Sequence, residues 1–185
     1  MKLLTIKSIM RQILIILTAL TLFACEKTNP VTTGQVQTRP YRIFAFDLDS
    51  FNYAYMGQQV TIDVGALIEP GIYMEPVYAY RLTLNYDPAY LQFVSAEKGF
   101  CLSNAAGSTT YSAALKDGIE GGLLIEEVSD SGDGYKGACQ LSLVTFTVLK
   151  YGTSGISYSD VSLTDPDGNE LLYTNESQVI NLYGA

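Results

Sequence analysis

The chain has 185 residues, with 19 acidic and 11 basic side chains, no histidine and a net charge of −8. This acidity disfavours nucleic-acid binding, which depends on Lys and Arg to displace the counterions of the phosphates. The absence of histidine excludes Ser-His-Asp and Cys-His catalysis and removes the commonest transition-metal ligand.

The N-terminus has the features of a secretory signal. Three basic residues precede the apolar run 13–22, which is shorter than the ~20 apolar residues of a transmembrane helix. The run ends in Leu22–Cys25 (LFAC), which resembles the lipobox that lipoprotein signal peptidase cleaves. The resemblance implies that residues 1–24 are a lipoprotein signal peptide and that Cys25 carries the lipid. The alternatives are an ordinary signal peptide or an uncleaved anchor.

Removal of the signal leaves 161 residues with a net charge of −11, because the signal holds three basic residues and no acidic one. A diacylated cysteine supplies the two chains that stable anchoring needs. We therefore expect an exported protein that contacts a membrane only through its lipid, in the bacterial cell envelope at the outer membrane or the cell surface. Polar residues 25–40 are predicted to form a flexible tether, and residues 41–185 a single domain.

Beyond residue 40 the sequence is typical of β-strands separated by turns. In residues 59–68 the apolar side chains alternate with polar ones, which places one face of the strand in a core. No segment predicts a helix, and residues 129–137 form a turn-rich loop. About nine strands at this spacing predict an all-β sandwich with jelly-roll topology. They comprise residues 41–48, 59–68, 77–86, a strand from Leu91, and residues 109–114, 122–128, 141–149, 156–163 and 178–182.

Cys101 and Cys139 remain once Cys25 is lipidated. An even pair of cysteines in an exported protein indicates a disulfide. Two buried free thiols are the alternative, because spacing alone does not show that the two Cα atoms lie close together.

Several segments, in this order, resemble cohesin domains. The similarity extends over residues 42–183, nearly the whole predicted domain. The segments are Gly57–Val64 (GQQVTIDV), Leu82–Pro88 (LTLNYDP) followed by Leu91, Gly99, Asp130–Val148, Gly152–Ile156 and Asp165–Asn169.

The resemblance implies a nine-stranded jelly-roll sandwich that binds dockerin modules on one sheet face. The lack of a recognisable catalytic arrangement separately predicts that the chain is not an enzyme. Cohesins use the strand corresponding to residues 77–86 for this, so the resemblance makes Arg81, Thr83 and Asn85 the leading partner-binding candidates. Glu126, on the predicted strand 122–128, is a weaker candidate, because the sequence does not fix which face of that strand it occupies. A solvated sheet face is the alternative explanation for these polar residues.

Two further functions remain open at this stage. The chain has fourteen tyrosines and no tryptophan, and the cohesin fold also houses carbohydrate-binding modules, so surface tyrosines could stack on a polysaccharide. Tyrosine is also common in strands and in cores, which is the structural alternative. The remaining hypothesis is a structural or adhesion domain with no dedicated ligand.

No metal ligand set or catalytic pair stands out. Glu126 and Glu127 are adjacent in a predicted strand, so their side chains point to opposite faces and do not share a site. The turns around Asp130, Asp133 and Asp165–Asn169 hold oxygen ligands that suit calcium, although the glycine in the last one comes too early for an EF-hand loop. We expect these segments to be ordinary turns, with no cofactor required and calcium as the alternative.

Overall fold

The computed structural model describes residues 40–46, 48, 54–67, 75–102, 107–130 and 134–182. The chain divides into two compact units, residues 1–36 and 37–185, and every described residue belongs to the second. The predicted signal peptide, Cys25 and the tether as far as residue 39 lie outside the described residues. Within the described ranges, no helix is long and apolar enough to cross a membrane.

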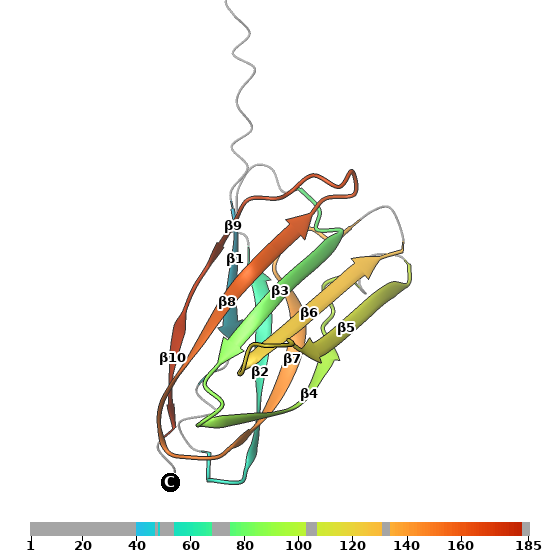
Figure 1. Cartoon of the computed structure of the whole chain (residues 1–185). Helices are drawn as coiled ribbons and strands as arrows, with labels where there is room; N and C mark the ends of the chain where they lie inside the picture. The colour runs from blue at the N-terminus through green and yellow to red at the C-terminus, as the bar shows by residue number, and fades with distance from the viewer. Residues whose placement is uncertain are drawn as a thin grey trace, which may run out of the picture. The chain divides into compact units, whose positions relative to one another are not determined.

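The described residues form ten β-strands in two five-stranded sheets (Figure 1). The β1 sheet has the order β4-β7-β2-β1-β9, and the β3 sheet has the order β10-β8-β3-β6-β5. The strands are β1 (Tyr41–Phe46), β2 (Gln59–Leu67), β3 (Ala79–Tyr86), β4 (Leu91–Lys98), β5 (Thr109–Leu115), β6 (Gly122–Ser129), β7 (Cys139–Val148), β8 (Gly152–Thr164), β9 (Tyr173–Asn175) and β10 (Gln178–Leu182).

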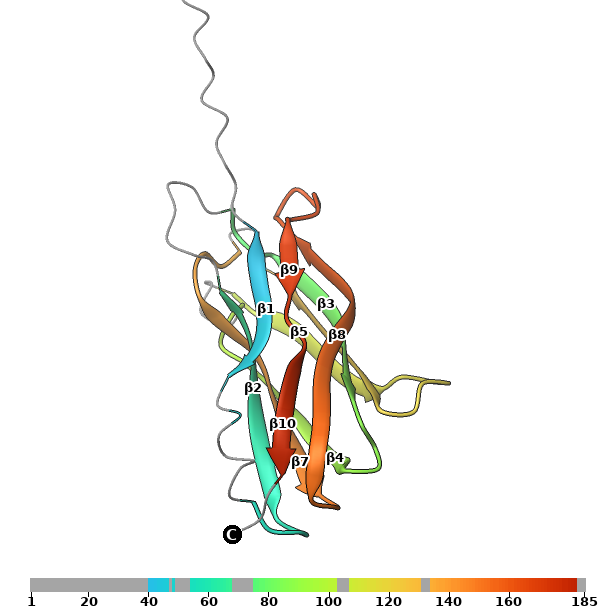
Figure 2. The same cartoon turned by 90° about the vertical axis from the view of Figure 1, so that its left-hand side faces the viewer.

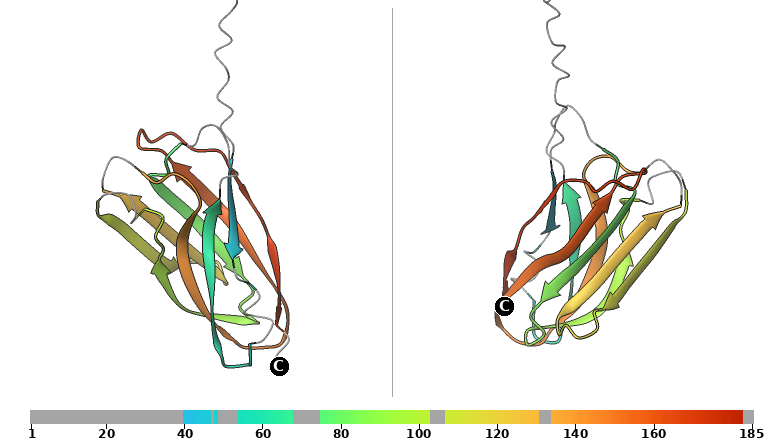
Figure 3. Two further views of the ribbon diagram at one scale, coloured as in Figure 1. Left: turned by 180° about the vertical axis from the view of Figure 1, so that it is seen from behind. Right: turned by 45° about the horizontal axis from the view of Figure 1, so that its top comes forward.

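The two sheets pack face to face, and neighbouring strands within each sheet are antiparallel except at one place. There β1 pairs with β9 in parallel, from Tyr41 opposite Tyr173 to Ile43 opposite Asn175. The chain then changes sheets between β9 and β10, which lie one after the other along the same side of the molecule (Figure 2). Figure 3 shows the molecule from behind, with the β1 sheet toward the viewer, and in a tilted view with the β3 sheet toward the viewer.

The core lies between the sheets and follows the alternation of the sequence. Val60, Ile62 and Val64 of β2 are buried, as their spacing predicts, because alternate side chains of a strand point to the same face. Leu82 and Leu84 of β3 are buried from the opposite sheet. The predicted all-β sandwich is thereby confirmed, and so is the inward face of these two strands.

The main differences from the predicted strands lie near the C-terminus. The described residues include β9, a three-residue strand that the sequence analysis did not predict, and β8 begins at Gly152 rather than at Ile156. All three residues of β9 are exposed, so no apolar alternation marks the strand. Its pairing with β1 comes from a partner more than 130 residues away in the chain.

Cys101 and Cys139 are joined by a disulfide, with their Cα atoms 4.7 Å apart. Both residues are buried. Cys139 begins β7, and Cys101 follows the end of β4, where its backbone N–H donates a hydrogen bond to the carbonyl of Gln140 (2.9 Å). This backbone hydrogen bond therefore continues the β4–β7 pairing beyond the last residue of β4, and the disulfide lies beside it.

Candidate functional site

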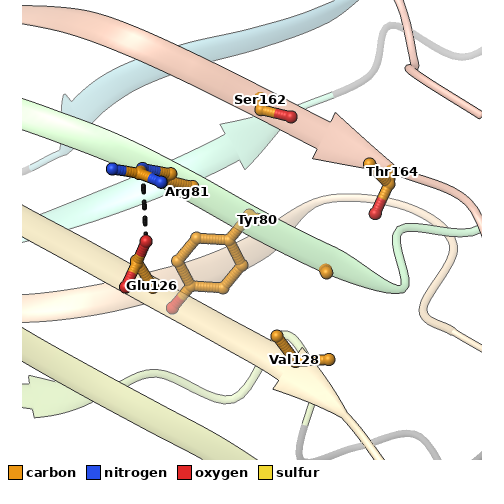
Figure 4. Close-up of a pocket in the computed structure, with 7 residues that line it drawn as sticks. Tyr80, Arg81, Glu126, Val128, Ser162 and Thr164 are labelled. Atoms are coloured by element: carbon orange, nitrogen blue, oxygen red, sulfur yellow. Dashed lines mark ion pairs between the residues drawn. The ribbon is translucent and has the colours of Figure 1, made fainter. Parts of the chain in front are cut away.

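The outer face of the β3 sheet carries an exposed ion pair at its centre. Arg81 of β3 stands opposite Glu126 of β6 in the strand register, and its Nε lies 3.2 Å from Glu126 Oε1. The two side chains point toward one another across the strands (Figure 4). They remain 56% and 35% exposed, respectively, and line a shallow hollow of about 230 Å³ together with Ser162 of β8.

The expectation that Thr83 is exposed was wrong, because its side chain is fully buried although it points to the outer face. The Lys116 side chain and Asp160 cover it. Thr83 Oγ1 donates a hydrogen bond to Asp160 Oδ2 (3.2 Å) and accepts one from Lys116 Nζ (3.4 Å). Thr83 therefore supports these two charged residues and does not itself offer a contact surface in the free protein.

Asn85 is the third of the outward residues of β3, after Arg81 and Thr83, and it is half-buried. Its Nδ2 donates a hydrogen bond to Ser159 Oγ of β8 (3.1 Å). Of the three β3 candidates, Arg81 is thus the most accessible, and Asn85 is oriented by its neighbour.

Asp160 is a residue of this face that the sequence analysis missed. Its carboxylate forms an ion pair with Lys116, and it is the one non-glycine residue with positive φ (48°) among the described residues. Two residues of β8, Asp160 and Val161, lie opposite the single residue Leu82, because Arg81 pairs with Ser162 and Thr83 with Ser159. Such a one-residue excess is a β-bulge.

The sequence contains a signal for this bulge. Ile156 and Tyr158 are buried at even positions of β8, whereas Val161 and Leu163 are buried at odd positions. A strand with unbroken alternation keeps its buried residues at one parity. The change of phase between Tyr158 and Val161 therefore places the extra residue at positions 159–160.

The charged groups of this face alternate in sign along one row: Glu126, Arg81, Asp160 and Lys116. The hydrogen bond and the charge of Lys116 are the main causes that lower the pKa of Asp160, and the charge of Arg81 contributes less. The carboxylate is therefore ionised throughout the neutral range. The row carries no net charge on a chain that is acidic overall.

Short hydroxyl side chains surround the charged row. Within the described strands of the β3 sheet, no tyrosine points to this outer face, because all four occupy core-facing positions: Tyr80, Tyr86, Tyr111 and Tyr158. The face therefore lacks the tyrosine platform that a polysaccharide would need there. The outward hydroxyl residues include Thr110, Ser112, Ser157, Ser159, Ser162 and Thr164.

Glu127 points to the opposite side of β6 from Glu126, as the alternation predicts, and is fully buried. Its Oε1 accepts a hydrogen bond from Thr109 Oγ1 (2.7 Å). Burial raises the pKa of Glu127, while hydrogen bonds from Thr109 and Tyr80 and the charge of Lys98 oppose that rise. The two adjacent glutamates thus serve the surface and the core separately.

The aspartate-rich segment at Asp165 forms a turn stabilised by its own side chain. Asp165 Oδ1 accepts hydrogen bonds from the backbone N–H groups of Asp167 (2.9 Å) and Asn169 (2.8 Å), and Oδ2 accepts one from Asn169 Nδ2 (2.9 Å). These hydrogen bonds, with the Asn169 side chain as the main cause, lower the pKa of Asp165. Asp130 binds Ser108 through its Oδ2, and Asp133 lies outside the described residues. No cluster of three potential metal-ligating side chains occurs in the described ranges.

A family model described as "Cohesin domain" matches residues 45–181. A type II cohesin domain from the cellulosome of Acetivibrio cellulolyticus has 23% identity and a TM-score of 0.62, over 78% of this chain and 96% of that chain. A non-cellulosomal cohesin from Archaeoglobus fulgidus has 15% identity and a TM-score of 0.60, over 77% and 90% of the respective chains.

A structure of a type I cohesin–dockerin complex from Clostridium thermocellum, containing the OlpA cohesin, gives 15% identity and a TM-score of 0.60, over 77% of this chain and 98% of that chain. No curated protein matches the sequence. At these identities the structural similarities establish the fold of the two sheets.

Proposed function

The chain belongs to the cohesin domain family, whose members are non-catalytic binding modules, and from this we propose that it binds a dockerin module through the outer face of the β3 sheet. The observation that carries the proposal is the family match over residues 45–181, which spans eight of the ten described strands completely and part of the other two.

Solved relatives support the choice of partner. The OlpA cohesin of Clostridium thermocellum was solved in complex with a dockerin, and so was the sixth cohesin of scaffoldin B from Acetivibrio cellulolyticus, with the Cel5 dockerin. Both cohesins share the fold of this chain. A dockerin is therefore the partner class that best fits a module of this family.

The face itself supports the choice of surface. Central β3 lies between β6 and β8, so its outward side chains are flanked by partner strands on both sides and are held in place. Arg81 is exposed there and Glu126 is partly exposed, and small hydroxyl groups around them allow close approach of a partner. A stable interface buries ~1,600 Å² in total and depends on a few central residues, which is the position that Arg81 and Glu126 occupy.

We also propose that lipidation of Cys25 attaches the module to the cell envelope. Two or more acyl chains on one cysteine provide stable anchoring, whereas a single chain gives only reversible attachment. The lipid would fix the location, and the β3 sheet would hold the partner there.

The test is a binding measurement with the full chain in detergent and a panel of recombinant dockerins. The panel includes dockerins encoded in the source genome and the Doc918 module, each with and without calcium, and soluble polysaccharide as a separate ligand. We expect at least one dockerin to bind with micromolar or tighter affinity. Polysaccharide binding with no dockerin bound would overturn the proposal.

Paired variants locate the surface. Replacement of both Arg81 and Glu126 by alanine is expected to weaken binding at least tenfold, since a central interface residue is worth more than about 1 kcal/mol. Replacement of both Arg42 and Glu176, an ion pair of 2.6 Å in the β1 sheet region with similar exposure, removes the same charges elsewhere. This control is expected to bind within twofold of the original chain, and equal losses in both variants would refute the β3-sheet location.

A further inference from the structure

We propose that Asp160 is a specificity-determining residue of the docking face and that it selects a partner presenting an arginine or lysine side chain to it. This inference rests on the proposed function and specifies the partner chemistry at the same surface. It is carried by three observations: the backbone of the bulge, the free oxygen of the carboxylate and the charges around it.

The backbone at Asp160 is held in an uncommon conformation. A non-glycine residue at φ 48° is in the left-handed region, which side chains rarely adopt and which Asp and Asn tolerate best. An uncommon conformation of this kind persists only where the surrounding structure holds it, and residues that adopt one concentrate at binding and catalytic sites. Here β3 holds the strand on both sides of the bulge, at Ser159 and at Ser162. The bulge directs the carboxylate onto the outer face, near its centre.

The carboxylate has one oxygen engaged and one available. Both Lys116 Nζ and Thr83 Oγ1 bind Oδ2, whereas no residue that the structure describes forms a hydrogen bond to Oδ1, and the side chain is 56% exposed. Glu126, the other acidic group of the row, is only 35% exposed. Asp160 is therefore the more accessible of the two acceptors. Its lowered pKa keeps it charged in the neutral range.

An ionised, fixed acceptor discriminates between partners by charge. A hydrogen bond between a carboxylate and a cationic donor is roughly twice as strong as one between neutral groups. The chain is acidic overall, and an acidic partner side chain facing Asp160 would meet like charge. Because Oδ2 is occupied, the partner's cation would bind Oδ1, which either a guanidinium or an ammonium group can do. A neutral hydroxyl partner would gain less and would discriminate less.

The test compares Asp160→Asn with Asp167→Asn in the full chain, using the dockerin that binds the original chain most tightly. Asparagine tolerates the left-handed backbone and keeps an oxygen for Thr83, so the bulge is retained while the charge is removed. Asp167 is an exposed residue of the turn after β8 and serves as the matched loss of one negative charge. Far-ultraviolet circular dichroism and thermal unfolding establish that both variants are folded.

Asp160→Asn is expected to weaken binding at least tenfold and to reduce the dependence of the affinity on salt, whereas Asp167→Asn stays within twofold. Replacing the dockerin's lysines and arginines singly by glutamine should find one whose loss adds nothing in the Asp160→Asn background. Equal binding by both aspartate variants would overturn the role of Asp160 and leave the proposed function standing. The same holds if no basic residue of the dockerin is coupled to Asp160. Absence of dockerin binding by the original chain would overturn the proposed function together with this inference.

Discussion

Reduction of the Cys101–Cys139 disulfide is expected to lower the free energy of unfolding by about 4 kcal/mol. The two cysteines are 38 residues apart, and in the chain-entropy model a loop of this length costs the cross-linked unfolded chain about 13 cal/mol/K. In the folded state, both cysteines lie where β4 and β7 are already paired, so breaking the bond removes few native contacts. The loss should therefore arise in the unfolded state.

Urea unfolding of the same chain with and without reductant measures the effect without changing any side-chain volume. The chain has no tryptophan, so circular dichroism is the appropriate signal. With a denaturant dependence of about 2 kcal/mol per molar urea, the midpoint should fall by about 2 M on reduction. Mass spectrometry of alkylated peptides reports whether the bond is present in each sample.

A midpoint shift below about 0.5 M, between samples shown to be oxidised and reduced, would refute the argument from chain entropy. The enclosed segment contains β5 and β6, which carries Glu126 of the docking face. Below the unfolding range, the reduced protein is nevertheless expected to bind its partner as the oxidised protein does. Both cysteines are buried beside the β4–β7 pair and do not contribute to the outer face of the β3 sheet.

Three further predictions concern single residues. Because the pKa of Glu127 is raised in the fold, its contribution is most favourable below about pH 4.5 and is lost as the pH rises through the folded-state value. Urea unfolding of Glu127→Gln should therefore show a gain of about 1–3 kcal/mol in the free energy of unfolding over the original chain at pH 7 and no gain at pH 4. Glu126→Gln is the surface control, and a similar gain in that variant would contradict burial of the Glu127 carboxylate as the cause. Gly99→Ala should destabilise by about 1–3 kcal/mol in thermal unfolding, because its Cβ would lie 2.1 Å from a backbone carbonyl oxygen of β7, whereas Gly155→Ala, with its nearest atom at 4.0 Å, should be nearly neutral. Cys25→Ser should abolish incorporation of labelled fatty acid and shift the chain from the detergent phase to the aqueous phase, and unchanged labelling would refute lipidation at this residue.

Local sequence was sufficient for the sandwich class and for the inward faces of its central strands. The alternation in β2 and β3 reflects contacts that every residue of the strand makes in the same way, so it is visible without knowing the partner strands. Strand β9 lacks this property, because its three residues are exposed and it lies at the edge of its sheet, paired with β1 among the described strands. A short strand that is exposed at every position gives no periodic signal of its own.

The candidate site was predictable only in part, for a related reason. The outward direction of Arg81 follows from its parity, whereas placing Glu126 on the same face needs the β3–β6 register, which the sequence does not give. The burial of Thr83 depends on Lys116 and Asp160, which come from two other parts of the chain. Parity gives the direction of a side chain, and it does not reveal what other side chains cover it. The bulge at Asp160 left a phase change in the sequence, whereas its ion pair with Lys116 left none.

The opposite orientations of Glu126 and Glu127 also limit how this domain can change in length during evolution. A one-residue insertion or deletion early in β6 would exchange the two carboxylates, placing Glu126 among core residues and Glu127 on the surface, and would turn Leu123 and Ile125 outward. Length variation among descendants of this sequence should therefore accumulate in the segments between strands, while β6 keeps its residue count even as its individual side chains are replaced.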